Sequence, residues 1–255
     1  PTPCSAGTVQ PLVKRPKCDR CSAGKFMNET GHTECHACVP GSYCPEGASV
    51  PLSCGEGTHS KRSDLGAAAD CTGTDAGYFS PAGSTEQTEC SPGTAQPDAG
   101  MGTCDKCAAG TYQKGGGKQA CVACEPGSYC AEGASAPLPC GEGTYSNATN
   151  LTSADQCSPA AAGHYAPTGS KQQTPCSPST VQPNASKGAC KRCEAGTYQA
   201  NEGEKKCVVC GGGNYSANTL SCEECQIGEF CELSLTLGVA KSRGVRCPSG
   251  FTTRG

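Results

Sequence analysis

The sequence predicts a small disulfide-rich fold, arranged as a tandem array of short modules with little regular secondary structure and almost no helix. Cysteine accounts for 25 of the 255 residues, a density typical of disulfide scaffolds. Leu, Ile, Val and Phe together make up less than a tenth of the chain, and Trp is absent. The cysteines also recur at a constant interval, which is the pattern of a repeat protein.

The shortage of apolar residues means that covalent bridges must hold the chain together. Ordering a chain costs about 1.5 kcal/mol per residue in conformational entropy, and so few apolar side chains cannot offset that cost by burial. The net charge of −3 does not indicate a nucleic-acid or anionic-membrane partner. Because no apolar run is long enough to span a bilayer, we also expect no membrane insertion within this chain.

The repeat has a period of 86 residues. Its first copy contains Cys4, Cys18, Cys21, Cys35, Cys38, Cys44, Cys54 and Cys71, and its second contains Cys90, Cys104, Cys107, Cys121, Cys124, Cys130, Cys140 and Cys157 at the same spacing. A third copy begins with Cys176, Cys190, Cys193 and Cys207. We therefore expect three cysteine-rich repeats, at residues 1–89, 90–175 and 176–255. The last of these contains an inserted module at 210–222 and ends before it is complete.

Each repeat is built from a smaller unit, Cys-x-x-Gly-(Thr/Ser)-(Tyr/Phe). An aromatic residue follows the glycine by two positions at ten of the chain's twelve Tyr and Phe residues. Such regular use indicates one small core per module rather than a ligand site, with each ring covering its own disulfide or the adjoining module. The glycine suits a tight turn or a close approach of the backbone.

The inserted module indicates how most cysteines pair. It adds two cysteines at once, so they should bridge each other, and the same logic applies to the other units of this size. The predicted bridges are Cys210–Cys222, Cys4–Cys18, Cys21–Cys35, Cys90–Cys104, Cys107–Cys121, Cys176–Cys190 and Cys193–Cys207. Zinc binding by the Cys-x-x-Cys pairs is disfavoured because four cysteines per repeat would remain unexplained. A catalytic redox role would need a βαβ context that is absent.

The other four cysteines of each repeat allow more than one pairing. The favoured arrangement is interlaced, with Cys38–Cys54 and Cys44–Cys71 in the first copy and Cys124–Cys140 and Cys130–Cys157 in the second. The alternative joins Cys38 to Cys44 and Cys54 to Cys71. In the third copy we expect Cys225–Cys247, or Cys231 with a partner beyond Gly255, which would make this chain a window of a longer protein. The segment 72–89 has the glycine and aromatic signal but no bridge of its own.

Several stretches resemble a known family. The runs CSAGKF, CEPGSYCAEGASAPLPCGEGTYS and CSPGTAQPDAGMGTCDKCAAGTYQ resemble the ephrin-receptor-like repeats of the growth-factor-receptor cysteine-rich superfamily. The CAAGTYQ…CVAC core is also similar to a tumour-necrosis-factor-receptor module. This resemblance implies an elongated stack of small β-hairpin modules in an extracellular protein. Arrays with PGSYC and CGEGTYS units are similar to those of protist and algal surface proteins, including the mastigoneme proteins of flagellar hairs.

Two kinds of surface site are predicted. Five Asn-x-Ser/Thr sequons, at Asn28, Asn147, Asn150, Asn184 and Asn214, are candidates for N-glycosylation. Leu233, Leu235, Leu237 and Val239 alternate with smaller or polar residues, as in a half-buried strand. That strand either covers its own loop or pairs with a neighbouring chain at an edge.

No nucleophile, general base, metal cluster or cofactor cradle can be assembled from the sequence, so an enzyme is not expected. The primary hypothesis is a stiff, glycosylated rod within an extracellular filament, such as a flagellar hair. Its partners would be copies of itself or filament co-subunits, together with covalent glycans, at the cell surface and specifically at a flagellar or ciliary surface. The alternative is a receptor or adhesin ectodomain that binds a protein ligand.

Overall fold

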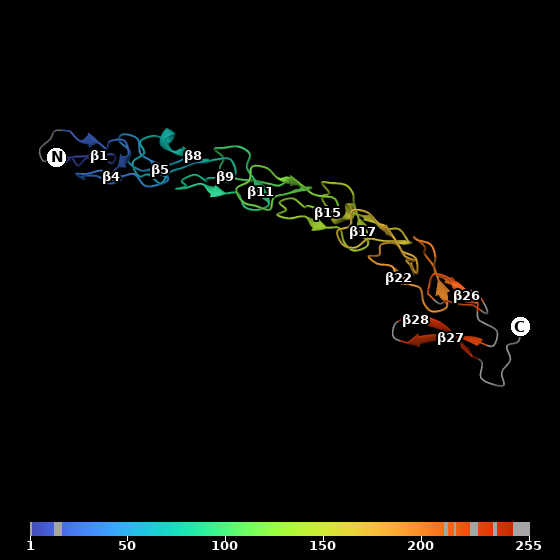
Figure 1. Cartoon of the computed structure of the whole chain (residues 1–255). Coiled ribbons are helices and arrows are strands. Elements are labelled where there is room, and N and C mark those ends of the chain that lie inside the picture. Colours follow the sequence, from blue (N-terminus) through green and yellow to red (C-terminus); the bar gives the residue numbers. More distant parts are fainter. Residues whose placement is uncertain are drawn as a thin grey trace. The chain divides into compact units, whose positions relative to one another are not determined.

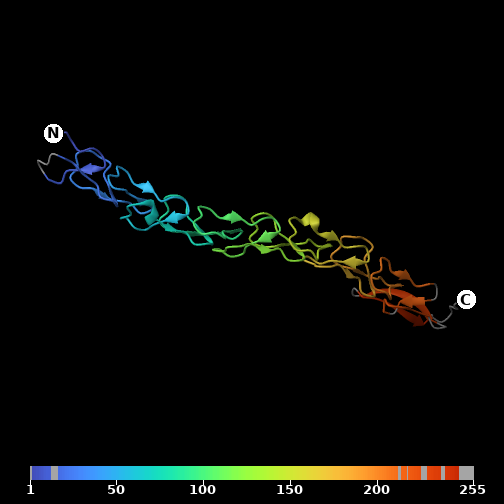
Figure 2. The same cartoon turned by 90° about the horizontal axis from the view of Figure 1, so that it is seen from above.

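The computed structural model describes residues 2–12, 17–211, 214–216, 218–224, 229–236 and 239–246. Within these residues the chain forms 28 strands, paired as 14 two-stranded antiparallel sheets, with two short 3-10 helices and no α-helix. The strands form separate short ribbons rather than one continuous sheet (Figures 1 and 2). The prediction of a disulfide-rich array of small hairpins with almost no helix is confirmed.

The residues fall into two compact units, which are described separately. The first comprises residues 1–123 and 131–136. Its strands are β1 (Thr8–Val9), β2 (Asp19–Arg20), β3 (Lys25–Phe26), β4 (His36–Ala37), β5 (Ser42–Tyr43), β6 (Leu52–Ser53), β7 (Thr58–His59), β8 (Thr72–Gly73), β9 (Tyr78–Phe79), β10 (Thr88–Glu89), β11 (Thr94–Ala95), β12 (Asp105–Lys106), β13 (Thr111–Tyr112) and β14 (Val122–Ala123), with the 3-10 helix η1 at Ala68–Asp70. Each odd-numbered strand pairs with the next even-numbered one.

The second unit comprises residues 124–130 and 137–255. Its strands are β15 (Ser128–Tyr129), β16 (Leu138–Pro139), β17 (Thr144–Tyr145), β18 (Ser158–Pro159), β19 (His164–Tyr165), β20 (Thr174–Pro175), β21 (Thr180–Val181), β22 (Lys191–Arg192), β23 (Thr197–Tyr198), β24 (Val208–Val209), β25 (Asn214–Ser216), β26 (Cys222–Glu224), β27 (Glu229–Thr236) and β28 (Val239–Arg246), with η2 at Ala154–Gln156. The pairing follows the same rule as in the first unit.

A tight turn starts each hairpin from β1–β2 to β23–β24. At the turn before β7, the backbone N–H and the Oγ1 hydroxyl of Thr58 both donate to the Gly55 carbonyl, at 3.1 and 2.7 Å. Gly57, just before Thr58, has a φ of +74°, which the third position of such a turn requires. Ser179 takes this place before β21 with a φ of +71°. A non-glycine residue there is uncommon, because its Cβ crowds the backbone.

Successive hairpins are joined by a recurring set of backbone hydrogen bonds. Between hairpins β3–β4 and β5–β6, the N–H of Gly24 donates to the Cys44 carbonyl at 2.8 Å. In return, the N–H of Cys38 donates to the Gly24 carbonyl, also at 2.8 Å. The next junction repeats this register, because the Gly41 N–H donates to Ser60 and the Gly41 carbonyl accepts from Cys54. The turn glycine therefore bonds through its N–H to the following hairpin and through its carbonyl to the cysteine that links the two hairpins.

The turn glycine also contacts the hairpin after the next one. A Cβ added at Gly41 would overlap the carbonyl oxygen of Gly83, which belongs to the loop of hairpin β9–β10. A Cβ added at Gly24 would lie 2.6 Å from the Asp64 carbonyl oxygen, in the loop of β7–β8. Glycine at this position is thus required both by the turn and by close packing of two backbones.

We expect Gly41→Ala to loosen the hairpins around it, because the substitution combines a positive φ with a steric overlap. The loss should exceed about 1 kcal/mol and appear as faster amide hydrogen exchange in β5–β6 and β9–β10. Gly55→Ala is the matched control, because an added Cβ there has no atom within 4 Å. Equal exchange in the two variants would contradict the proposed backbone packing.

Candidate functional site

The disulfides are the main candidate for what holds each module together. Seven of them have the connectivity inferred from the inserted module: Cys4–Cys18, Cys21–Cys35, Cys90–Cys104, Cys107–Cys121, Cys176–Cys190, Cys193–Cys207 and Cys210–Cys222. In six of them the first cysteine lies three positions before the turn glycine, or its equivalent, and the second directly precedes the second strand; Cys222 is itself the first residue of β26. The bridge therefore ties the turn before the first strand to the point where the loop enters the second strand. A loop of about 15 residues closed in this way gains about 3 kcal/mol of stability in the chain-entropy model.

The interlaced pairing of the remaining cysteines is wrong. The structure joins Cys38 to Cys44 and Cys54 to Cys71, not Cys38 to Cys54 and Cys44 to Cys71. The second repeat likewise has Cys124–Cys130 and Cys140–Cys157 in place of Cys124–Cys140 and Cys130–Cys157.

The physical reason for this pairing is position relative to the turn glycine. Cys44 lies three residues after Gly41, the place that Met27 occupies after Gly24, where the side chain is buried in its own hairpin. Cys38 precedes the same turn, so the two sulfurs meet across it. Cys54 begins the next hairpin, which Cys71 closes. The interlaced prediction was based on the number of residues between two cysteines. That number does not show on which side of the turn glycine each cysteine lies.

The cores are small and consist largely of these bridges. The buried cluster of Cys38, Cys44 and Ala48 is covered by Phe26 from the preceding hairpin. Tyr129 covers the cluster of Cys140, Leu151 and Cys157 in the same way. The sequence left open whether each aromatic ring covers its own disulfide or the adjoining module. Phe26 and Tyr129 do the latter, because each covers the bridge of the next hairpin.

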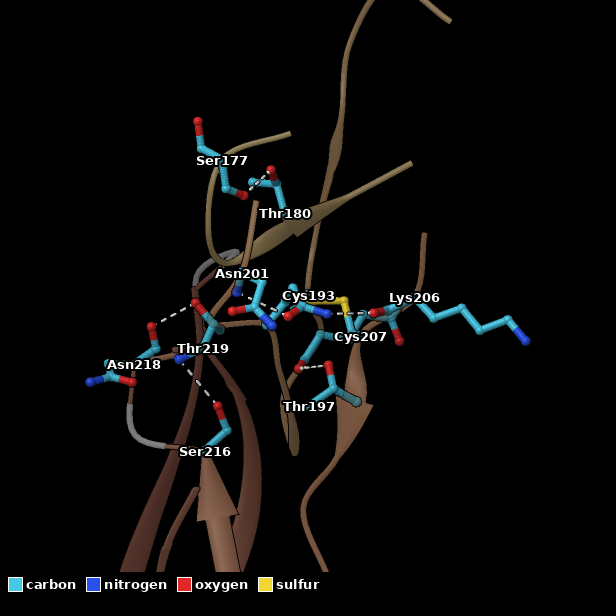
Figure 3. Close-up of a disulfide and its surroundings, with 12 residues drawn as sticks. Ser177, Thr180, Cys193, Thr197, Asn201, Lys206, Cys207, Ser216, Asn218 and Thr219 are labelled. Atoms are coloured by element: carbon cyan, nitrogen blue, oxygen red, sulfur yellow. Dashed lines mark hydrogen bonds between the residues drawn. A yellow bond between two sulfur atoms is a disulfide. The ribbon is translucent and has the colours of Figure 1, made fainter. Parts of the chain in front are cut away.

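A buried glutamine, which the sequence analysis missed, takes the place of an apolar core residue in four hairpins. Gln96 is only 1% exposed; its Nε2 donates to the Thr103 carbonyl at 2.9 Å, and its Oε1 accepts the Asp98 N–H at 3.1 Å. Gln113, Gln182 and Gln199 make the same two kinds of bond. Gln199 bonds to the backbone of Asn201 and Lys206. Both of these residues lie near the Cys193–Cys207 bridge (Figure 3). The sequence does contain a sign of this buried position, because glutamine recurs three residues after the turn residue in all four hairpins.

Two of the thirteen hairpins from β1–β2 to β25–β26 have no disulfide, and a glutamine side chain spans the same place. In β9–β10, Gln87 accepts the Asp75 N–H at 2.8 Å and donates through Nε2 to the Asp75 carboxylate at 2.9 Å. In β19–β20, Gln173 accepts the Ala161 N–H at 2.8 Å. Each glutamine occupies the position of the second cysteine. Hydrogen bonds of this kind contribute about 1 kcal/mol each, less than a bridge.

A polar cleft of about 380 Å³ lies beside hairpin β7–β8. It is lined by His59, Ser60, Lys61, Arg62, Thr72, Glu86 and Gln87. Lys61 pairs with Glu86 at 2.8 Å, and Arg62 with Asp64 at 2.9 Å. The side-chain hydrogen bond and charge of the basic partner lower the pKa of Asp64 and of Glu86. Both ion pairs are exposed, so they favour the folded chain weakly at neutral pH, and that effect fades as the pH falls through the lowered pKa values.

The predicted glycosylation sites differ in accessibility. Asn28, Asn147, Asn150 and Asn184 are exposed on loops. Asn214 is half-buried at the start of β25, and the sequon's Ser216 is 1% exposed. The Ser216 hydroxyl also accepts the Thr219 N–H at 3.1 Å (Figure 3). Glycosylation at these positions stays a prediction.

The leucine-rich stretch forms the hairpin β27–β28, so the predicted strand exists for Leu233 and Leu235. Val239 is not its continuation, because it begins β28 and lies opposite Thr236. Because β27 and β28 pair antiparallel, the chain direction at Val239 is opposite to that at Thr236, which alternation alone could not show. Leu237, Cys225 and Cys247 lie outside the described residues, and no pairing of Cys231 can be assigned. The interface role of this stretch stays a prediction.

Comparison with known proteins identifies part of the chain. Residues 180–221 match the family model described as "Tyrosine-protein kinase ephrin type A/B receptor-like". No curated protein matches the chain. The matched region spans β21–β22, β23–β24 and most of the next hairpin, and this family is a receptor-like cysteine-rich repeat rather than a catalytic module. Together with the bridges, the match indicates an extracellular disulfide-rich module.

The described residues offer no sign of metal or membrane chemistry. No group of three or more His, Cys, Asp or Glu side chains among them could hold a metal ion. None of the helices in the described part of the chain has the length and apolar character needed to cross a bilayer.

We expect Gln96→Leu to destabilise hairpin β11–β12 by about 1–3 kcal/mol, because the Thr103 carbonyl and the Asp98 N–H each lose a partly buried hydrogen bond. Amide exchange at Asp98 and its neighbours measures the loss. Gln119→Leu is the matched control at an exposed position and should change stability by less than about 0.5 kcal/mol. A similar effect of the two substitutions would contradict a structural role for the buried glutamines.

We expect Asn214 to carry less glycan than Asn147 in the secreted protein, because closure of β25–β26 buries the Ser216 hydroxyl of its sequon. Mass spectrometry of glycopeptides measures occupancy at both sites. The double substitution Cys210→Ser/Cys222→Ser opens this hairpin and should raise occupancy at Asn214 while leaving Asn147 unchanged. Comparable occupancy of the two sites in the unmodified chain would show that burial does not control access.

Proposed function

We propose that this chain is a non-catalytic structural segment of a larger secreted or cell-surface protein. In this proposal the hairpins form a stiff, glycosylated rod within an extracellular filament, such as the mastigoneme hair of a flagellum. Its partners are copies of itself or filament co-subunits, and its surface carries covalent glycans. The extracellular setting rests on the bridges and the family match.

The repeated register between hairpins is the observation that carries the proposal. Within each unit the turn residue donates its N–H to the next hairpin and accepts, through its carbonyl, from the residue that links the two hairpins, as at Gly41 in the first unit and Gly163 in the second. Contacts of the same turn with the hairpin after the next one add a second connection. A junction held by two neighbours resists bending better than a junction held by one, which supports a stiff array.

The resemblance to flagellar-hair proteins supports the specific kind of filament. It rests on the PGSYC unit, at residues 40–44 and again at 126–130, and on the CGEGTYS unit at 140–146, which is CGEGTHS at 54–60. The first of these units ends with the second cysteine of the Cys38–Cys44 type of bridge, and the second begins with the first cysteine of the Cys54–Cys71 type. Hairpin β27–β28 remains our candidate for the contact with a neighbouring chain.

The receptor or adhesin alternative is favoured by one asymmetry. The cleft beside β7–β8 is lined by His59, Lys61 and Glu86, and the corresponding residues of the second repeat are Tyr145, Asn147 and Gln172. The charged residues are thus specific to the first repeat, whereas the second has a sequon in that place. A ligand site confined to one repeat would show such a difference.

We expect the isolated chain to have a radius of gyration well above about 18 Å, the value for a compact globule of this length. Small-angle X-ray scattering on the purified, disulfide-intact chain measures it. Labelling of native cell-surface filaments with antibodies against this chain then tests the filament assignment. A radius close to that of the compact globule would refute the rod, while labelling of receptors outside filaments would favour the alternative.

A further inference from the structure

We propose that the two unbridged hairpins, β9–β10 and β19–β20, are extensible elements: under tension they open and release a defined length of chain while bridged hairpins stay closed. The proposal places one such element in each of the first two 86-residue repeats. Extensibility is a property of the chain itself. Its use in a load-bearing filament rests on the proposed function.

The bridges determine which residues can bear a load. When a chain is pulled from its ends, tension crosses the Cys54–Cys71 disulfide and does not reach the residues between the two cysteines. It crosses Cys90–Cys104 in the same way. The segment between Cys71 and Cys90 contains no disulfide that could carry the tension past it, so every residue of β9–β10 bears the load. The segment between Cys157 and Cys176, with β19–β20, is equivalent.

Only non-covalent contacts resist opening of these segments. Hairpin β9–β10 is held by its two-residue ladder and by the Gln87–Asp75 bonds. It is also held by bonds to the next hairpin, including the Gly77 N–H to the Gln96 carbonyl at 2.8 Å. In β19–β20 the corresponding contacts are those of Gln173 and the bond from the Gly163 N–H to the Gln182 carbonyl at 2.7 Å. All of them can break and re-form without chemistry at sulfur.

Between Cys4 and Cys222, the other loaded segments are shorter. Cys18 and Cys21, or Cys104 and Cys107, are three residues apart and can release almost nothing. Cys44 to Cys54 spans ten peptide steps, because the Cys38–Cys44 bridge does not enclose β6. At about 3.4 Å per extended residue, such a segment reaches at most about 34 Å, whereas the nineteen steps from Cys71 to Cys90 reach at most about 65 Å. The unbridged hairpins therefore give the longest release.

Single-molecule pulling of the whole oxidised chain tests the proposal. Handles attached at Thr2 and Glu224 keep β27–β28 off the loaded path, and should record two long events of equal length, each no longer than the fully extended segment from Cys71 to Cys90. The variant Thr74→Cys/Gln87→Cys places cysteines at the two positions that other hairpins bridge, and should remove one of these events. Ala160→Cys/Gln173→Cys should remove the other, and the combined variant should lack both. The event that remains in each double variant reports that the rest of the chain is folded.

Two controls keep the outcome decisive. Thr74→Ser/Gln87→Ser alters the same positions without sulfur, and should keep the length of its event while lowering the force. At zero force, amide exchange should be faster in β9–β10 than in the bridged β13–β14. Absence of the two long events, or their persistence in variants whose new bridge is verified by peptide mapping, would overturn the proposal. A chain that extends in this way but labels no filament would refute only the proposed function.

Discussion

The disulfide that closes a hairpin of two-residue strands is the interaction on which the rest of the structure depends. A ladder this short provides few hydrogen bonds, and an isolated two-stranded hairpin is at best marginally stable in water. The bridge removes part of the unfolded chain's entropy and so replaces the apolar core that the composition cannot supply. Where Cys4–Cys18 or Cys107–Cys121 closes its hairpin, the hydrogen bonds between the strands need contribute little to its stability.

With the ends clamped, the interior can be polar. Gln96 and Gln113 lie where a larger protein would place an aliphatic residue, and each bonds to the backbone of its own loop. These bonds satisfy loop groups that would otherwise be unpaired in a thin module. In the bridged modules the disulfides therefore set the fold, and in the four modules with a buried glutamine its amide sets the path of the loop.

The exposed parts of the modules are free to differ between repeats. The loop after β7 has Lys61 and Arg62 in ion pairs, whereas the equivalent loop after β17 has the sequons of Asn147 and Asn150. The hairpins β9–β10 and β19–β20 lack a bridge in both repeats and use Gln87 and Gln173 in its place. A shared scaffold thus has places that can vary in charge, in modification and in resistance to force.

The sequence by itself determined the class of fold, the 86-residue period and the bridges of the simple modules, because cysteine spacing and scarce apolar residues leave no other way to hold the chain. It also indicated a special backbone at the glycine before each aromatic residue. Only the tertiary structure decided between Cys38–Cys44 and Cys38–Cys54, because that choice depends on which side chains meet across a turn. The same holds for Gln96 and Gln87, whose partners are loop atoms, and for Val239, which a chain reversal places in a second strand. The spacing of residues gives only their separation along the chain. These contacts depend on where the backbone turns and on the direction in which each side chain then points.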